Sequence, residues 1–251
     1  MNRKTAKKAA TIEARMNSSR LPGKILKPIL GKPSLERLVE RVRRSRWIDE
    51  VIVATTTSAR DDEVEQWAGK AGVCCFRGSE EDVLARVLDA AKAFGGEIIV
   101  ELTGDCPLID PEIIDELMAL YISQDFDYVS NILERTYPRG LDTQIFSTAV
   151  LEEVSRLTQD PADRENVSLY IYEHPDHYKL GGIRAPKSCY GPDLRICVDT
   201  IEDFDVVESV YKALYPRNPG FGSADIVKFL RSHPKIAALN ACVRQKAVRP
   251  G

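Results

Sequence analysis

The chain has 251 residues, of which 43% are hydrophobic and 29% are charged, enough for one domain with a sizeable core. Its formal net charge of −3 argues against a general nucleic-acid surface, and no apolar run approaches the roughly 18 to 20 residues that span a bilayer. The six cysteines form no CxxC pair, and the basic N-terminus lacks the apolar core of a secretory signal. We therefore expect a cytoplasmic protein that binds neither nucleic acid nor membrane.

Strand-like and helix-like patterns alternate through the first half of the chain. Asp110 stands where an N-cap is expected, and Pro111 follows it in the first turn of a helix. Strands are expected at 9–14, 51–56, 73–76 and 97–105, and helices over 33–45, 61–72, from about Ser79 or Asp82 to Gly95, and from Pro111 onward. This alternation predicts a three-layer α/β fold, in which helices cover both faces of a mostly parallel sheet.

The second half of the chain has a less regular pattern. Strands are expected at 127–132, 142–147, 178–185 and 194–199, and helices over 148–157, 161–173, 201–214 and 223–232. No repeat, low-complexity linker or clean boundary interrupts it. We therefore interpret residues 1–251 as one domain whose last segment, 233–251, is a tail.

A basic loop, ARMNSSRLPGK at 14–24, follows the first predicted strand. Ligands of open α/β sheets bind beyond the carboxyl ends of the strands, and Arg15, Arg20 and Lys24 can converge there on phosphate oxygens. The loop is not a Walker A motif, because Ser18 and Ile25 stand where that motif needs Gly and Ser or Thr. The structural alternative is a solvated surface loop.

Two aspartates, Asp105 and Asp199, each end a predicted strand. A carboxylate at that edge can hold Mg²⁺, which takes one or two protein carboxylates together with phosphates and water. Asp105 can also be a simple turn residue, and the nearby Asp110 is explained as an N-cap. Thr200 and Asp203 have capping-box spacing, which leaves Asp199 without a structural explanation. Two carboxylates beside a basic loop predict one Mg²⁺–polyphosphate site.

Several segments of the chain resemble those of a known family. The segment ARMNSSRLPGKILKPILGKPSLERLVERV resembles the opening signature of the CMP-Kdo synthetase and N-acylneuraminate cytidylyltransferase family. The chain most resembles its spore-coat polysaccharide cytidylyltransferase-like branch, which is similar again at FRGSEEDVLARVLDAA, LTGDCPLIDP, YPRGLDTQIF, DPADRENVSLYIYEHP and LRICVDTIEDF. The resemblance implies a mixed, mostly parallel sheet of the nucleotide-diphospho-sugar transferase type. It also implies a nucleotide-binding half at 9–126, and a half at 127–232 for the acceptor and for dimerisation.

The resemblance further implies roles for individual residues. Catalysis would fall to Arg15, Lys24 and Asp105, and Mg²⁺ would be held by Asp105 and Asp199. Contacts with the nucleotide are implied for Arg15, Ser19, Arg20, Lys24, Arg77, Ser79, Asp82 and Arg86. Contacts with the acceptor are implied for Arg139, Asp142, Arg164 and Asn166. The chain departs from the branch at Glu101, where Arg is expected, and at Asn166, where His is usual.

The implied activity is the transfer of CMP from CTP to a sugar, such as Kdo or a nonulosonic acid, with release of pyrophosphate. A homodimer is implied as well. The alternatives are a sugar 1-phosphate nucleotidyltransferase that uses another nucleoside triphosphate, and a non-catalytic nucleotide-binding module. A glycosyltransferase would need a DxD motif at a strand end. Neither Asp125–Asp127 nor Asp203–Asp205 is placed there, and we interpret both as solvated charge.

Overall fold

The computed structural model describes residues 2–249. Its main sheet has seven strands in the order β5-β4-β1-β6-β8-β7-β9. Their bounds are β1 Lys8–Glu13, β4 Glu50–Thr56, β5 Cys74–Gly78, β6 Ile98–Thr103, β7 Tyr128–Ser130, β8 Gln144–Ser147 and β9 Leu180–Gly182. Strand β8 runs antiparallel to both of its neighbours, and every other pairing in the sheet is parallel. The predicted mixed, mostly parallel sheet is confirmed.

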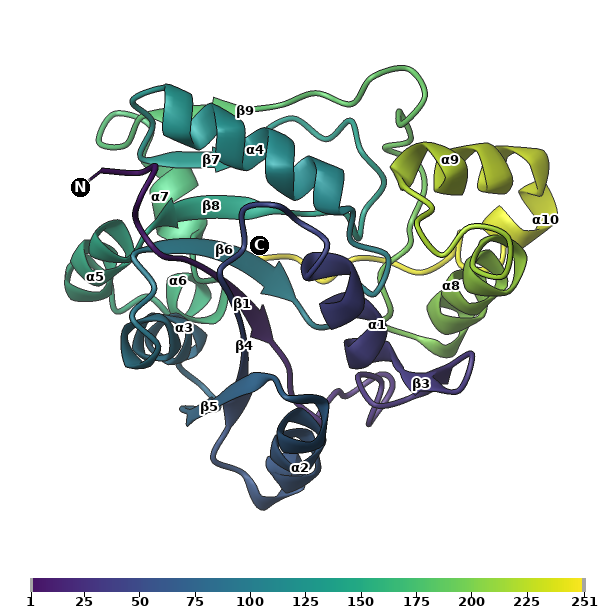
Figure 1. The fold of residues 1–251 in the computed structure, drawn as a ribbon, viewed down its shortest axis with the longest axis horizontal. Helices are drawn as coiled ribbons and strands as arrows, with labels where there is room; N and C mark the ends of the chain where they lie inside the picture. Colours follow the sequence, from purple (N-terminus) through teal and green to yellow (C-terminus); the bar gives the residue numbers. More distant parts are fainter. Residues whose placement is uncertain (1, 250–251) are drawn as a thin grey trace.

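Helices cover both faces of the sheet (Figure 1). The larger apolar core joins one face to α1 (Ser34–Val42), α2 (Asp62–Ala71), α4 (Pro111–Ser123), α8 (Ile201–Leu214) and α9 (Ser223–Ser232). A smaller core packs the other face against α3 (Val83–Ala93), α5 (Thr148–Leu157) and α7 (Leu169–Glu173), with α6 (Pro161–Glu165) beside α3. The remaining elements are a hairpin of β2 (Pro28–Ile29) and β3 (Lys32–Pro33), the 3₁₀ helix η1 (Ala59–Asp61), and α10 (Pro234–Ala237).

The helix boundaries follow the capping residues of the sequence. The Asp110 carboxylate accepts the backbone N–H of Glu112 at 3.0 Å, and α4 begins at Pro111. Helix α2 ends at Gly72, whose φ of +60° is the left-handed conformation that glycine adopts at little cost. Thr200 and Asp203 form the predicted capping box of α8. In the part of the chain described, no helix combines the length and apolar character needed to cross a membrane.

Three segments differ from the expected elements. Residues 194–199 form no strand of the main sheet, and only an isolated bridge joins Arg139 to Arg195. Their apolar residues are buried in the larger core. A buried extended segment has the same apolar sequence pattern as a buried strand, which is why a strand was expected here. The helix expected over 161–173 breaks into α6 and α7, because Val167 has a φ of +34° that a right-handed helix cannot continue. The strand expected over 178–185 shortens to β9.

The parallel pairing of β1 with β6 places the ends of both strands at one edge of the sheet. Glu13 is in register with Thr103, so the basic loop after β1 and the turn at Asp105 after β6 begin side by side. The chain after α10, yellow in Figure 1, runs back from the far end of the molecule toward this part of the sheet. This edge is where the candidate site lies.

Candidate active site

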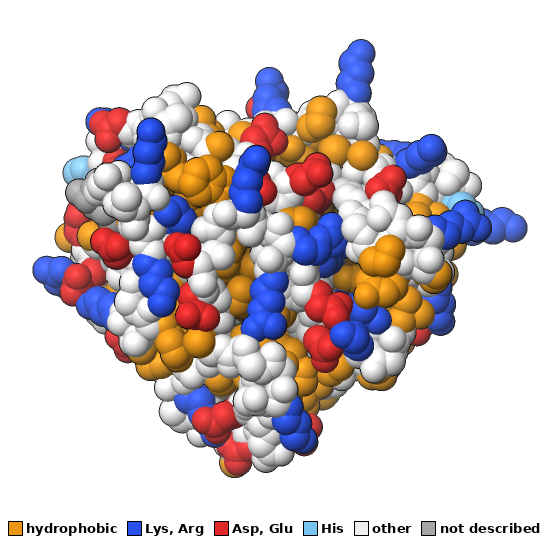
Figure 2. Space-filling view, in the orientation of Figure 1, with side chains coloured by type: hydrophobic (Ala, Val, Ile, Leu, Met, Phe, Trp, Pro, Cys, Tyr) orange, Lys and Arg blue, Asp and Glu red, His pale blue; other side chains and the backbone are white. Residues whose placement is uncertain are grey.

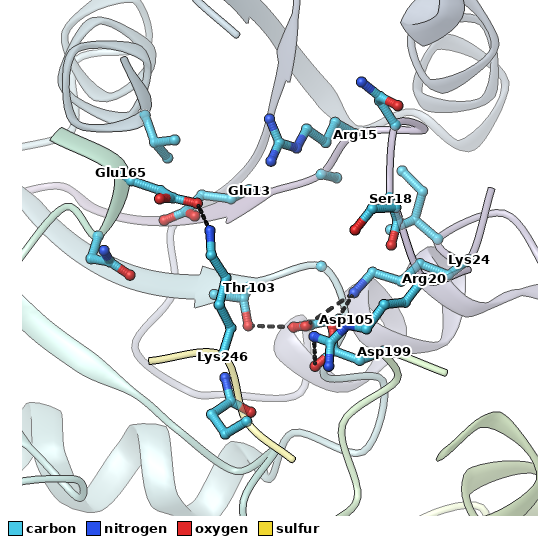
Figure 3. Close-up of a pocket in the computed structure, with 18 of the residues that line it drawn as sticks. Glu13, Arg15, Ser18, Arg20, Lys24, Thr103, Asp105, Glu165, Asp199 and Lys246 are labelled. Atoms are coloured by element: carbon cyan, nitrogen blue, oxygen red, sulfur yellow. Dashed lines mark hydrogen bonds and ion pairs between the residues drawn. The ribbon is translucent and has the colours of Figure 1, made fainter. Parts of the chain in front are cut away.

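Two adjoining cavities lie beside the ends of β1 and β6. The first has a volume of about 530 Å³ and is lined by the loop after β1 together with residues of α3, the turn after β6 and the C-terminal segment (Figure 3). The second has a volume of about 590 Å³ and extends toward Arg139 and Tyr172. Eight residues line both cavities, and we call this shared set the junction: Glu13, Thr103, Asp105, Glu165, Asn166, Asp199, Gln245 and Lys246.

Lys24 connects the basic loop to both of the predicted metal carboxylates. Its Nζ lies 3.2 Å from Oδ2 of Asp105 and 2.8 Å from Oδ1 of Asp199, and its side chain is 13% exposed. Burial disfavours the charged ammonium, but the two carboxylates outweigh this effect and raise the pKa of Lys24. Lys24 is therefore a fixed positive charge in the first cavity, in contact with two residues of the junction.

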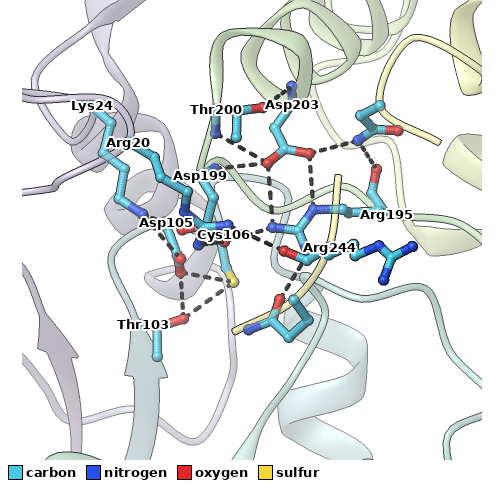
Figure 4. A network of polar contacts seen from close by, with 12 residues as sticks. Arg20, Lys24, Thr103, Asp105, Cys106, Arg195, Asp199, Thr200, Asp203 and Arg244 are labelled. Atoms are coloured by element: carbon cyan, nitrogen blue, oxygen red, sulfur yellow. Dashed lines mark hydrogen bonds and ion pairs between the residues drawn. The ribbon is translucent and has the colours of Figure 1, made fainter. Parts of the chain in front are cut away.

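Asp199 is surrounded by cations (Figure 4). Its Oδ2 lies 3.0 Å from Nη2 of Arg20 and 2.5 Å from Nη2 of Arg195. Burial acts to raise the pKa of Asp199, but Lys24, Arg20 and Arg195 together lower it below its usual value. Asp199 thus stays ionised and can serve as a hard oxygen ligand.

A buried carboxylate supports this arrangement from behind. Asp203 is fully buried and accepts the Nε–H of Arg195 at 2.9 Å and the backbone N–H of Asp199 at 3.0 Å. The interpretation of Asp203 as solvated charge is therefore wrong, although Asp205 is exposed as expected. Asp203 orients Arg195, and Arg195 in turn orients Asp199.

Two backbone contacts set the turn that carries Asp105 against β1 and against the segment that carries Asp199. The N–H of Gly104 donates to the carbonyl of Glu13 at 2.8 Å, and a Cβ on Gly104 would lie 2.7 Å from that same oxygen. Only glycine therefore lets the turn after β6 approach β1 so closely. The N–H of Val198 donates to the carbonyl of Asp105 at 2.7 Å, which sets the extended segment 194–199 against the turn.

The donor set at the junction fits Mg²⁺. Asp105 and Asp199 both contact one cation, the Lys24 ammonium, which shows that positive charge is stabilised between them. Within residues 2–249, no group of three or more His, Cys, Asp or Glu side chains could hold a metal. Mg²⁺ commonly binds through one or two carboxylates and completes its octahedron with phosphate oxygens and water. The two aspartates suit a Mg²⁺ ion that arrives with a polyphosphate.

The residues predicted to contact the nucleotide divide into two groups. Arg15, Ser19, Arg20, Lys24 and Arg86 line the first cavity.

Three other residues predicted to contact the nucleotide, Arg77, Ser79 and Asp82, lie outside both cavities and make structural contacts. Arg77 donates to the carbonyls of Thr56 and Ser58 and pairs with carboxylates of α2. Ser79 accepts the N–H of Asp82, and Asp82 caps α3.

The predicted acceptor residues also divide. Arg139 and Asp142 line the second cavity, where Asp142 accepts a bidentate pair of bonds from Arg135 at 2.6 and 2.9 Å. Asn166 lies at the junction, and its Nδ2 donates to the carbonyl of Ala162 at 2.7 Å. Arg164 lies outside both cavities, where it pairs with Asp82 and donates to a carbonyl of α5.

Sequence reasoning assigned no role at the site to two groups of residues. Glu13 and Glu101 face the second cavity from neighbouring strands, and a charged residue inside each apolar run was the available signal. Gln245 and Lys246 come from the segment interpreted as tail, and no local pattern marks them. The two cavities therefore include two carboxylates and a lysine that the motifs do not contain.

A cytidylyltransferase family model matches residues 9–222. The chain belongs to the cytidylyltransferase family. It is 34% identical over 233 residues to the spore coat polysaccharide biosynthesis protein SpsF of Bacillus subtilis, covering 90% of this chain and 95% of that protein. Over 110 residues it is 39% identical to a 3-deoxy-manno-octulosonate cytidylyltransferase of Geobacter sulfurreducens, covering 44% of this chain and 43% of that protein.

Solved structures agree with this assignment. A cytidylyltransferase from Leptospira borgpetersenii superposes with a TM-score of 0.88 at 33% identity, covering 96% of this chain and 99% of that one. A CMP:2-keto-3-deoxy-manno-octonic acid synthetase in complex with CTP shares the fold, with a TM-score of 0.65 at 22% identity over 82% and 99% of the two chains. The family and the fold together make this protein a nucleotidyltransferase, and the resemblance drawn from its motifs is confirmed.

Proposed function

We propose that this cytidylyltransferase transfers CMP from CTP to a hydroxyl group of a sugar and releases pyrophosphate. The observation that carries the proposal is the Lys24 ammonium held between Asp105 and Asp199, at the point where the two cavities meet. A basic first cavity suits the triphosphate, and the second cavity leaves room for an acceptor. The CTP complex of a protein with the same fold supports CTP as the donor.

In the proposed reaction, the acceptor oxygen attacks the α-phosphorus and the bond to the pyrophosphate oxygen breaks. Asp105 and Asp199 would hold Mg²⁺, which supplies positive charge to the phosphates when it is bound. Arg15, Arg20 and Lys24 would neutralise the charge that develops on the α-phosphate and on the leaving pyrophosphate. Phosphoryl transfer depends mainly on such positioning and electrostatic stabilisation, so no covalent intermediate is required.

The acceptor we propose is an acidic 3-deoxy-sugar, such as Kdo or a nonulosonic acid, used for a surface polysaccharide or glycan precursor. Relatives named for 3-deoxy-manno-octulosonate and for spore coat polysaccharide support this class. Arg139 lines the second cavity and offers a guanidinium for a carboxylate. A sugar 1-phosphate, with another nucleoside triphosphate as donor, is the alternative within the same reaction class.

Pyrophosphate release tests this proposal. CTP, GTP, UTP and ATP are each incubated with Mg²⁺ and a panel of 3-deoxy-sugar acids and sugar 1-phosphates. Release with CTP and a sugar acid alone is the expected result. Release only with a sugar 1-phosphate would show that the acceptor is a sugar 1-phosphate and not a sugar acid. Mg²⁺-dependent CTP binding without release across the panel would favour a nucleotide-binding module.

We also propose that the protein is a homodimer. Leu133 and Tyr190, which belong to the irregular second half, are 42% and 52% exposed and offer apolar surface to a partner. The face seen in Figure 2 carries acidic and basic side chains interspersed with apolar ones. Size-exclusion chromatography with light scattering distinguishes a dimer from a monomer.

A further inference from the structure

The C-terminal segment 244–249 crosses the edge of the active site and is anchored on both sides. Gln245 accepts a hydrogen bond from Nη1 of Arg195 at 2.7 Å, and the carbonyl of Arg244 accepts one from Arg20 at 3.3 Å. At the other end, Arg249 pairs with Glu173 at 2.6 Å and with the buried Asp163 at 2.7 Å. The segment is therefore held at one end by Arg20 and Arg195 beside the site, and at the other end by α6 and α7.

Lys246 lies between these anchors and lines both cavities. Its side chain reaches into the junction, where its Nζ contacts Glu165 at 3.0 Å (Figure 3). The other junction residues are four carboxylates, two amides and a hydroxyl. Lys246 is thus the cation that the tail adds to the set shared by the two cavities.

The partners of Lys246 leave it available for a ligand. Lys24 is held by two carboxylates and is largely buried, whereas the side chains of Lys246 and Glu165 are 73% and 49% exposed. An exposed ion pair of this kind contributes little stability, so Lys246 can exchange Glu165 for a substrate anion at small cost. Its flexible four-carbon stem allows the ammonium to follow that anion.

We propose that Lys246 is a catalytic residue, which binds an anionic oxygen of the substrates where CTP and the acceptor meet. This inference rests on the proposed nucleotidyl transfer. The anionic oxygen can belong to the α-phosphate of CTP or to the carboxylate or phosphate of the acceptor, because both would lie against the junction. Either contact is a charge-assisted hydrogen bond from an ammonium to an oxyanion.

The test compares Lys246→Ala with the conservative variant Lys246→Arg. The exposed Lys235 of α10 is a matched control, because Lys235→Ala removes a lysine of the same C-terminal region outside both cavities. We expect Lys246→Ala to lower kcat/KM by about tenfold to a hundredfold, the range for loss of one charged donor. Lys246→Arg should recover most of that loss, and Lys235→Ala should match the wild type.

The kinetic parameters identify the source of the anion. A higher acceptor KM, with unchanged CTP affinity, places Lys246 on the acceptor. A lower kcat or weaker Mg²⁺–CTP binding places it on the α-phosphate. Arg249→Ala, which releases the far end of the tail, should impair the same parameter as Lys246→Ala.

Two results would overturn the inference. One is a Lys246→Ala protein whose kcat, both KM values and CTP affinity all stay within twofold of the wild type. The other is a loss that Lys235→Ala reproduces. A wild-type protein that releases no pyrophosphate would reject the proposed function instead. The inference would then be judged by binding of Mg²⁺–CTP and of the sugar acids, and equal binding by wild type and Lys246→Ala would reject it too.

Discussion

Two glutamates beneath the second cavity, each with a buried carboxylate oxygen, should make the stability of this protein fall as the pH rises. Glu13 and Glu101 project from the same face of neighbouring parallel strands, since Glu13 pairs with Thr103 and Glu101 with Thr11. Oε1 of Glu13 and Oε2 of Glu101 are buried without a hydrogen-bond partner. Burial raises the pKa of Glu13 to about 7, against the opposing effect of Arg86, and raises the pKa of Glu101 as well.

The sign and size of the effect follow from linkage. A carboxyl whose pKa is raised on folding stabilises the protein fully below its unfolded pKa of 4.5, and that stabilisation is lost as the pH rises through about 7. With about 1.4 kcal/mol for each pKa unit, Glu13 alone accounts for a loss of about 3 kcal/mol between pH 4.5 and 7. This is an upper figure, because Glu13 keeps some solvent exposure.

The variant Glu13→Gln removes the ionisable group and keeps its shape. We expect it to gain stability relative to the wild type as the pH rises from 5 to 8, by up to about 3 kcal/mol. Urea unfolding followed by circular dichroism at several pH values measures the difference, and Glu63→Gln on the exposed side of α2 is the control. A difference between Glu13→Gln and wild type that stays constant from pH 5 to 8 would refute the reasoning.

Three further predictions concern the charges in and around the site. Lys24→Ala and Asp105→Ala should each lower the rate of pyrophosphate release by at least about 10²-fold while circular dichroism shows a retained fold, and near-normal turnover by either would reject the site. Arg195→Met leaves the fully buried Asp203 without its cation, so urea unfolding should show a loss of about 3–5 kcal/mol, and a loss below about 1 kcal/mol would contradict the supporting role of Asp203. EDTA should stop turnover and added Mg²⁺ should restore it, whereas turnover in EDTA would exclude a metal held by Asp105 and Asp199.

Much of the fold was predictable because its signals are local. Alternating strands and helices predict a parallel sheet, and Asp110, Gly72 and Thr200 mark helix ends through contacts within a few residues. The segment 194–199 was wrongly expected to be a strand, because its apolar pattern results from burial and not from strand pairing. The break between α6 and α7 was not predicted, because Val167 adopts a positive φ at a position where no glycine signals that conformation.

The difference between local and long-range contacts also explains which parts of the site were predictable. The proximity of Asp105 to the basic loop could be predicted, because parallel strands β1 and β6 end at one edge of the sheet. The position of Lys246 at the site could not be predicted. Its contact with Glu165 joins positions 81 residues apart and depends on the path of the whole C-terminal segment. No periodicity or cap encodes such a contact. The tail could be assigned to the site only from the three-dimensional structure.

The ion pairs of the junction also constrain how Mg²⁺ and CTP would bind. Lys24 occupies oxygens of Asp105 and Asp199 that the proposed metal would need, and Arg20 contacts Asp199 as well. If Mg²⁺ bound alone, it would displace these cations from Asp105 and Asp199, and no phosphate would be present to pair with them. If Mg²⁺ arrived with CTP, Lys24 and Arg20 could turn from the carboxylates to the phosphates, and each charge would keep a partner. The affinity for Mg²⁺ should therefore be weak in the free protein and much stronger with CTP, and titration calorimetry with and without the nucleotide measures that difference.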